Sequence, residues 1–143
     1  MSAKRFAAIV ASLRLNKDDQ KWFPLWIFKF ASSRNVSRSE QLVIDFDSVI
    51  HFSRGLRDGD VPAWQRLQAV RAIDCYRKSI LESDEPRLDK VLAKLQQIVT
   101  TLDDVMGFVK PEHPDRKWIR QSVNVAINRF LKAGAIKRIA PRP

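Results

Sequence analysis

The chain has 143 residues, with 26 Lys and Arg against 16 Asp and Glu, and its net charge is +10. Hydrophobic residues make up 45% of it, which favours a folded core over general disorder. One cysteine and two histidines argue against a disulfide or a zinc cluster, and no apolar run is long enough to span a bilayer. We therefore expect a basic cytoplasmic protein whose partners are polyanions, most often nucleic acid, and not membranes.

Helical apolar spacing recurs along almost the whole chain. Leu88, Val91, Leu95, Leu102 and Met106 show it most regularly, at intervals of three and four residues. The predicted fold is all-α, a compact bundle of five to six helices. The expected helices cover residues 4–15 and 23–33, a third helix that begins after Asp45 or Asp47 and ends near residue 58, and residues 62–81, 88–106 and 115–132. Residues 135–139 are either a short β strand, which could form a wing, or an extended tail.

Proline, glycine and aspartate residues suggest where these helices begin and end. Pro24 favours a helix start near residue 23, because proline suits a first turn and disrupts a helix interior. Asp45 or Asp47 can cap the helix that follows. Gly59 is expected to end that helix in a left-handed conformation, and Asp60 to cap the helix beginning at residue 62.

The charges and prolines divide the chain further. Basic blocks at residues 1–38, 64–81 and 110–143 have net charges of +6, +3 and +7, and the two acidic blocks between them carry −3 each. Two prolines within residues 110–114 mark a boundary. We therefore predict a helical domain at residues 1–109 and a basic helix with a short tail at residues 110–143.

The helix over residues 62–81 allows two interpretations. At 100° per residue, Arg66 lies close to the azimuth of Arg77, and Arg71 lies close to that of Lys78. Arginine can reach phosphates while its stem covers apolar surface, so this helix could lie against a nucleic-acid backbone. It could equally be a core helix whose arginines are solvated or paired with acidic residues, the candidates being Asp58, Asp60 and Asp74.

Several motifs within residues 21–81 resemble the tyrosine recombinases, in particular the integron integrases. They read Lys-Trp-Phe-Pro at residues 21–24, Phe-Ser-Arg-Gly-Leu-Arg at 52–57 and Val-Pro-Ala-Trp-Gln-Arg-Leu-Gln-Ala at 61–69, with Tyr-Arg at 76–77. In that family this region is the amino-terminal core-binding, or SAM-like, part. The resemblance implies DNA contacts made mainly to the backbone, with contacts to other recombinase subunits nearby.

The chain is too short to include that family's catalytic domain as well. His51 and Arg54 fit a His-x-x-Arg pattern upstream of the only tyrosine, Tyr76, but the residues before them do not provide the expected sheet and first arginine. We expect Tyr76 to pack near the helix surface, and Cys75 to be a partly buried thiol. The prediction is a chain without enzymatic activity, cofactor, metal or small-molecule substrate.

The last predicted helix opens with three cations, Arg116, Lys117 and Arg120. Cations in a first turn oppose the helix dipole, and phosphates would offset that repulsion. The segment around Lys137 and Arg138 is similar to the wing of a winged-helix protein. The alternative is a solvated basic helix packed through its apolar residues: Trp118, Ile119, Val123 and Phe130.

The leading hypothesis is a DNA-binding helical unit similar to the amino-terminal part of an integron-type recombinase, binding double-stranded DNA. One alternative is a winged-helix regulator that reads sequence through residues 115–132. Another is a protein-interaction module that binds a recombinase subunit. The predicted DNA-contacting residues are Lys29, Arg34, Arg38, Arg54, Arg66, Arg71, Arg77, Lys78, Arg116, Lys117, Arg120, Lys137 and Arg138.

Overall fold

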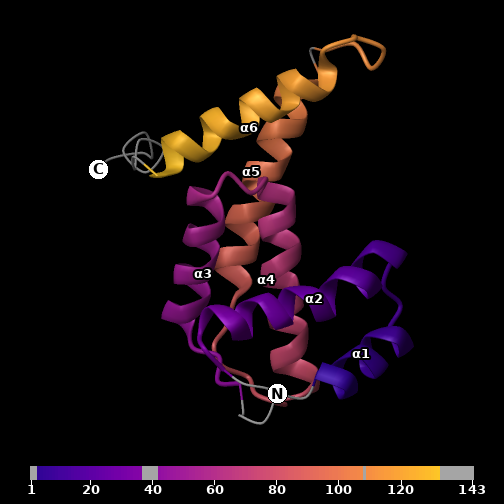
Figure 1. Cartoon of the computed structure of the whole chain (residues 1–143), viewed down its shortest axis with the longest axis vertical. Coiled ribbons are helices and arrows are strands. Elements are labelled where there is room, and N and C mark those ends of the chain that lie inside the picture. Colours follow the sequence, from indigo (N-terminus) through magenta and orange to yellow (C-terminus); the bar gives the residue numbers. More distant parts are fainter. Residues whose placement is uncertain (1–2, 37–41, 108, 133–143) are drawn as a thin grey trace.

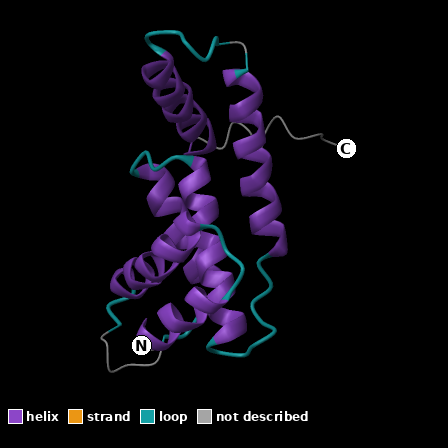
Figure 2. Cartoon of the chain, turned by 90° about the vertical axis from the view of Figure 1, so that its right-hand side faces the viewer, coloured by secondary structure: helices purple, strands orange, loops and turns teal. Residues whose placement is uncertain are grey.

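The computed structural model describes residues 3–36, 42–107 and 109–132, and these residues form six helices and no strand (Figures 1 and 2). The all-α bundle predicted from the sequence is confirmed. The segment expected to form a strand or wing, residues 135–139, lies outside the described residues. The helices are α1 (Ala3–Ser12), α2 (Lys17–Ser33), α3 (Phe46–Asp58), α4 (Ala63–Ser79), α5 (Asp89–Met106) and α6 (Arg116–Lys132).

Helix α4 is the centre of the bundle and contacts α1, α2, α3 and α5. Figure 1 shows α2 crossing α4, with α3 and α5 beside α4 and α6 lying across the opposite end of the bundle from α1. Helix α6 packs on α3 and α5. None of the described helices is long and apolar enough to cross a membrane.

The core lies mainly between α1, α2 and α4, and aromatic rings fill much of it. Phe6 packs edge-on against Tyr76 with ring centroids 5.2 Å apart, and Phe30 packs in the same way against Phe52 at 5.3 Å. Such pairs contribute beyond the area they bury. The other large apolar side chains of this core include Phe23, Trp26, Ile27, Leu42, Val49, Ile73 and Leu88.

Helix α2 begins at Lys17, six residues before the predicted start, and Pro24 lies inside it. The side chain of Asn16 caps the helix, because its Oδ1 accepts a 2.8 Å hydrogen bond from the backbone N–H of Asp19. Asp18 and Asp19 in the first turn favour the same start through the helix dipole. The prediction based on Pro24 was therefore wrong.

Helix α3 ends at Asp58 as predicted, but the left-handed residue lies one position later than expected. Gly59 has a φ of −86°, and the left-handed residue is Asp60 with a φ of 60°. The N–H of Val61 donates to the carbonyl of Leu56, and that of Asp60 to the carbonyl of Arg57, which is the Schellman pattern. Asp60 therefore does not cap α4, which starts after Pro62 without a side-chain cap.

The predicted cap of α3 is confirmed. The Asp45 side chain accepts a 2.8 Å hydrogen bond from the backbone N–H of Ser48, and the Ser48 hydroxyl accepts one from the backbone of Asp45. This reciprocal capping box satisfies two N–H groups that the first turn would otherwise leave free.

Candidate nucleic-acid interface

The two arginines of α4 that share one azimuth are buried. Arg66 is 1% exposed, and its Nη1 donates to the carbonyl of Val61 at 2.8 Å and to Oδ1 of Asn128 at 2.6 Å. Burial, together with repulsion from the Arg57 cation, lowers the pKa of Arg66 to about 10. A group held in this way does not face a phosphate backbone, so the structure contradicts the expectation for Arg66.

Arg77 is buried as well, and its hydrogen bonds go to residues near the end of its own helix. Its guanidinium donates to Oδ1 of Asp74 at 2.7 Å and to the carbonyl of Ser83. Asp74 also forms an ion pair with Lys78, whose Nζ lies 3.0 Å from Oδ2 of the carboxylate, although the Lys78 side chain remains largely exposed. The core interpretation of this helix, with Asp74 as a partner, therefore describes Arg77 correctly, and the DNA-contact expectation for it was wrong.

The remaining arginine of α4, Arg71, belongs to a polar network between α2 and α4. Its Nη2 forms a 2.7 Å ion pair with the buried Asp19, and its guanidinium lies over the ring of Phe23. The other oxygen of Asp19 accepts from Nε2 of Gln68 at 3.1 Å, and Oε1 of Gln68 accepts from the indole of Trp26 at 3.0 Å. Two residues of the motifs that resemble the recombinases, Phe23 and Gln68, thus take part in contacts between α2 and α4.

The other predicted residues of the amino-terminal half have different surroundings where the structure describes them. Arg34 pairs with Asp45 at 3.5 Å, and Lys29 is exposed with its ammonium over the ring of Trp26. Arg54 is exposed on α3 and lines a cavity described below. Arg38 lies outside the described residues.

Helix α6 carries five basic residues and no acidic one. Two of its predicted DNA contacts are engaged by α5: Arg116 donates to the carbonyls of Met106 and Val109, and Arg120 pairs with Asp103 at 3.1 Å. Lys117 is exposed and has no ion-pair partner among the described residues. Lys137 and Arg138 lie outside the described part of the chain.

The outward side of α6 differs from the expected apolar packing face. Trp118 is 69% exposed and Phe130 is 54% exposed, so the prediction that both pack inward was wrong. Helix α6 packs on α3 and α5 on its other side. We use the name outer α6 surface for five exposed residues of this helix, which are Lys117, Trp118, Gln121, Ser122 and Arg129.

A shallow groove joins this surface to the start of α4. It is lined by Lys117, Gln121 and the half-exposed indole of Trp64, with Asn124 at its base. Oδ1 of Asn124 is buried and has no hydrogen-bond partner among the described residues. Sequence reasoning did not select Trp64, Gln121, Asn124 or Arg129. The spacing of four, three and four residues places positions 118, 122, 125 and 129 on one side of the helix, but it does not show that this side faces solvent.

The two candidate nucleophiles considered in the sequence, Tyr76 and Cys75, are buried and partly buried, respectively. Tyr76 is 1% exposed and packs against Phe6. Burial raises the pKa of the half-buried Cys75 thiol. No group of three potential metal ligands occurs among the described residues. What the surface offers instead is charge and hydrogen-bonding side chains.

Comparisons with protein-family models, with curated proteins and with solved structures found no match to this chain.

Proposed function

We propose that the protein binds double-stranded DNA through the outer α6 surface. The observation that supports this most strongly is that α6 carries five cations and no carboxylate, with one side of the helix exposed. Phosphate neutralisation by lysine and arginine supplies most of the affinity in sequence-independent DNA binding. The net charge of +10 adds long-range attraction to the same polyanion.

The order of side chains along this surface suits a duplex. Lys117 and Arg129 are twelve residues apart, which places them roughly 18 Å apart along the helix axis and about 120° apart around it. Gln121 and Ser122 lie between these two cations and can donate to and accept from phosphates or base edges. An α-helix fits the major groove, whose width is about 12 Å. The proposed mode is phosphate contact near both ends of α6 with polar side chains between them.

The resemblance to tyrosine recombinases supports DNA as the polyanion, and it covers residues 21–81 only. We propose a helical DNA-binding unit similar to the amino-terminal part of those enzymes, with its interface shifted from α4 to α6. Binding without catalysis agrees with the burial of Tyr76, because an attacking hydroxyl must reach the scissile phosphate.

Fluorescence anisotropy with a labelled duplex of about two helical turns tests the proposal. Lys117→Gln and Arg129→Gln should each weaken binding about threefold to tenfold at low salt, because each removes one phosphate contact. Lys90→Gln removes the same charge from the exposed start of α5 and is the matched control, expected to change binding less than twofold. Equal losses in all three variants would contradict an interface on α6.

A second candidate function is protein binding, which the exposure of Trp118 and Phe130 favours. Aromatic residues are enriched in the centres of protein interfaces. Trp118→Ser should leave DNA affinity within about threefold if phosphate contacts dominate. Size-exclusion chromatography with light scattering at two protein concentrations would show whether the same substitution abolishes self-association instead.

A further inference from the structure

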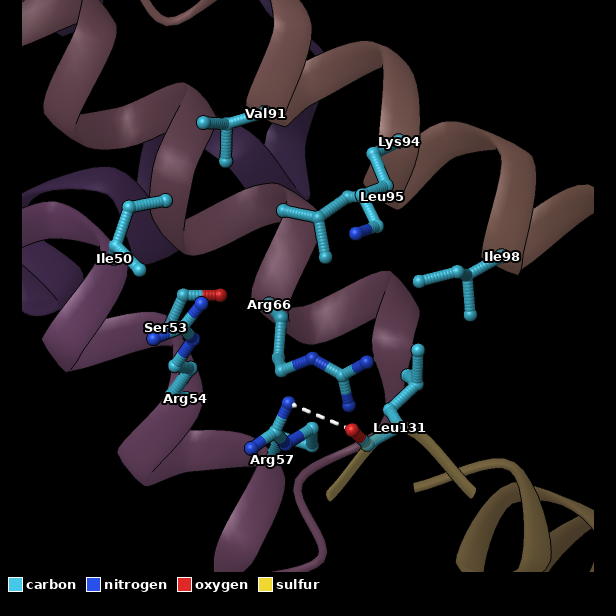
Figure 3. Close-up of a pocket in the computed structure, with 10 residues that line it drawn as sticks. All are labelled: Ile50, Ser53, Arg54, Arg57, Arg66, Val91, Lys94, Leu95, Ile98 and Leu131. Atoms are coloured by element: carbon cyan, nitrogen blue, oxygen red, sulfur yellow. Dashed lines mark hydrogen bonds between the residues drawn. The ribbon is translucent and has the colours of Figure 1, made fainter. Parts of the chain in front are cut away.

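A cavity of about 130 Å³ lies between α3, α4 and α5, beneath the end of α6 (Figure 3). Four cations line it, namely Arg54, Arg57, Arg66 and Lys94, and none of the described side chains in its lining is acidic. Like charges gathered at one site repel one another unless an anion is present. The cavity is therefore set up electrostatically for a negative ligand.

Only one of the four cations has a carboxylate partner among the described residues. Arg57 uses Nε for an exposed ion pair with Asp58 at 3.2 Å, and its Nη1 donates to the carbonyl of Leu131. Arg66 uses its Nη1 for hydrogen bonds to uncharged oxygens, which are the carbonyl of Val61 and Oδ1 of Asn128. The positive charge of Arg66 thus stays uncompensated inside the protein, and the Arg57 cation beside it lowers its pKa.

The rest of the lining is apolar. Figure 3 shows Arg66 between the α3 side chains Ile50 and Ser53 on one side and the α5 side chains Leu95 and Ile98 on the other. Leu131 from the last turn of α6 contributes a further wall. A site with several cations and aliphatic walls suits an anionic head group attached to an apolar body, because inorganic anions gain nothing from the walls.

The volume limits the size of that body. An engineered cavity of about 150 Å³ in another protein accepts one benzene molecule, so about 130 Å³ accepts a ring or a short branched chain. A carboxylate matches the fork of an arginine through two parallel hydrogen bonds. We infer that this cavity is a binding site for a small organic carboxylate, with its head group at the exposed Arg54 and Lys94, near the buried Arg66 cation, and its apolar body against Leu95 and Ile98.

This inference is independent of DNA binding, because neither Lys117 nor Arg129 lines the cavity. It also revises the expectation from the sequence that no small molecule binds. Lys94 was not among the residues singled out from the sequence, and Arg66 was assigned to a DNA-facing surface. The helices bring both residues to one site.

The test is a titration of the ¹⁵N-labelled full chain with sodium benzoate at constant ionic strength, followed by NMR. Saturable shifts are expected at the amides of Ser53, Leu95 and Ile98, with a Kd on the order of 1 mM for a ligand of about nine heavy atoms. Neutral benzamide and inorganic phosphate should each bind at least about tenfold more weakly. Benzamide lacks the negative charge, and phosphate lacks the apolar body.

Two variants, Lys94→Gln and Ile98→Phe, test whether the ligand binds in this cavity. Lys94→Gln should weaken benzoate about fivefold, whereas Lys90→Gln, one turn earlier on α5 and outside the cavity, should leave it unchanged. Ile98→Phe fills the cavity without removing charge and should abolish the shifts while the spectrum remains dispersed. Absence of saturable shifts up to about 20 mM would overturn the inference. So would equal affinity for benzamide or phosphate, or equal effects of Lys94→Gln and Lys90→Gln.

Discussion

Arg66 and Asn128 are 62 residues apart in the chain, and Nη1 of the arginine donates to Oδ1 of the asparagine at 2.6 Å inside the protein. Asn128 also donates to the carbonyl of Val61, which accepts from the same arginine nitrogen. These three groups join the start of α4 to the last turns of α6. The bond therefore holds in place the helix that we propose binds DNA.

Removing either partner should destabilise the fold. Arg66→Ala leaves the oxygen of Asn128 without its donor and opens space, and we expect a loss of about 2–4 kcal/mol in the free energy of unfolding. Asn128→Ala should cost about 1–3 kcal/mol. Urea unfolding measures both, and the double variant should show a coupling energy above about 1 kcal/mol. Additive losses would contradict a direct bond between the two side chains. The control is Arg129→Ala at an exposed position, whose free energy of unfolding should lie within about 0.5 kcal/mol of the wild-type value.

Gln68 should matter as the shared partner of Trp26 and Asp19. Gln68→Met keeps the volume and removes both hydrogen bonds, which leaves the indole N–H of the buried Trp26 without an acceptor. We expect a loss of about 1–3 kcal/mol and an altered near-ultraviolet circular dichroism signal. Lys21, an exposed residue of α2, supplies a control, because Lys21→Met should leave both the stability and the circular dichroism signal almost unchanged. Unchanged stability of Gln68→Met would contradict the network.

The turn after α3 distinguishes the structure from the sequence prediction. Gly59 lies at a φ of −86°, and a Cβ placed there would meet only backbone oxygens at 3.5 Å and beyond. Gly59→Ala should therefore be neutral or stabilise by up to about 1 kcal/mol. Asp60→Gly relieves a left-handed residue and should stabilise by about 0.5–1 kcal/mol. Thermal unfolding would contradict this assignment if Gly59→Ala were clearly destabilised.

Cys75 should react slowly with a thiol reagent. Burial is the main reason that the pKa of this thiol is raised. The reactive thiolate is therefore scarce at neutral pH, and its fraction grows only when the pH exceeds the ordinary pKa of a cysteine. Modification by a chromogenic disulfide at pH 8 should be at least about tenfold slower than that of a free cysteine. Unfolding in urea should restore the ordinary rate. A fast reaction of the folded protein would contradict the partial burial of this residue.

The helical class and most helix positions follow from the sequence because they depend on local apolar spacing. Helix α5 illustrates this: Leu95, Leu102 and Met106, three residues of its three-four pattern, are the ones buried. Pro24 led to error because the helix begins earlier, where Asn16 caps it, and continues with the proline inside it. Local signals compete there, and the sequence does not show which of them prevails.

The interface was harder to predict because burial of a charged side chain depends on distant partners. Arginine is mostly exposed in proteins, so Arg66 and Arg77 were natural candidates for contacting DNA. Their burial follows from the central place of α4, and Asn128 lies far along the chain. The basic character of α6 was visible in the sequence. Which side of α6 faces solvent depends on its packing against α3 and α5, and no pattern within α6 determines that.

The salt dependence of duplex binding tests the central claim most directly. With about two to three phosphate contacts, from Lys117, Arg129 and the exposed Lys132, a plot of log affinity against log salt should have a slope of about −2 to −3, and the Lys117→Gln/Arg129→Gln variant should reduce its magnitude by about 2. Lys90→Gln should leave the slope unchanged. A slope near zero for the wild-type protein, or the same slope in the double variant, would contradict DNA binding through the outer α6 surface.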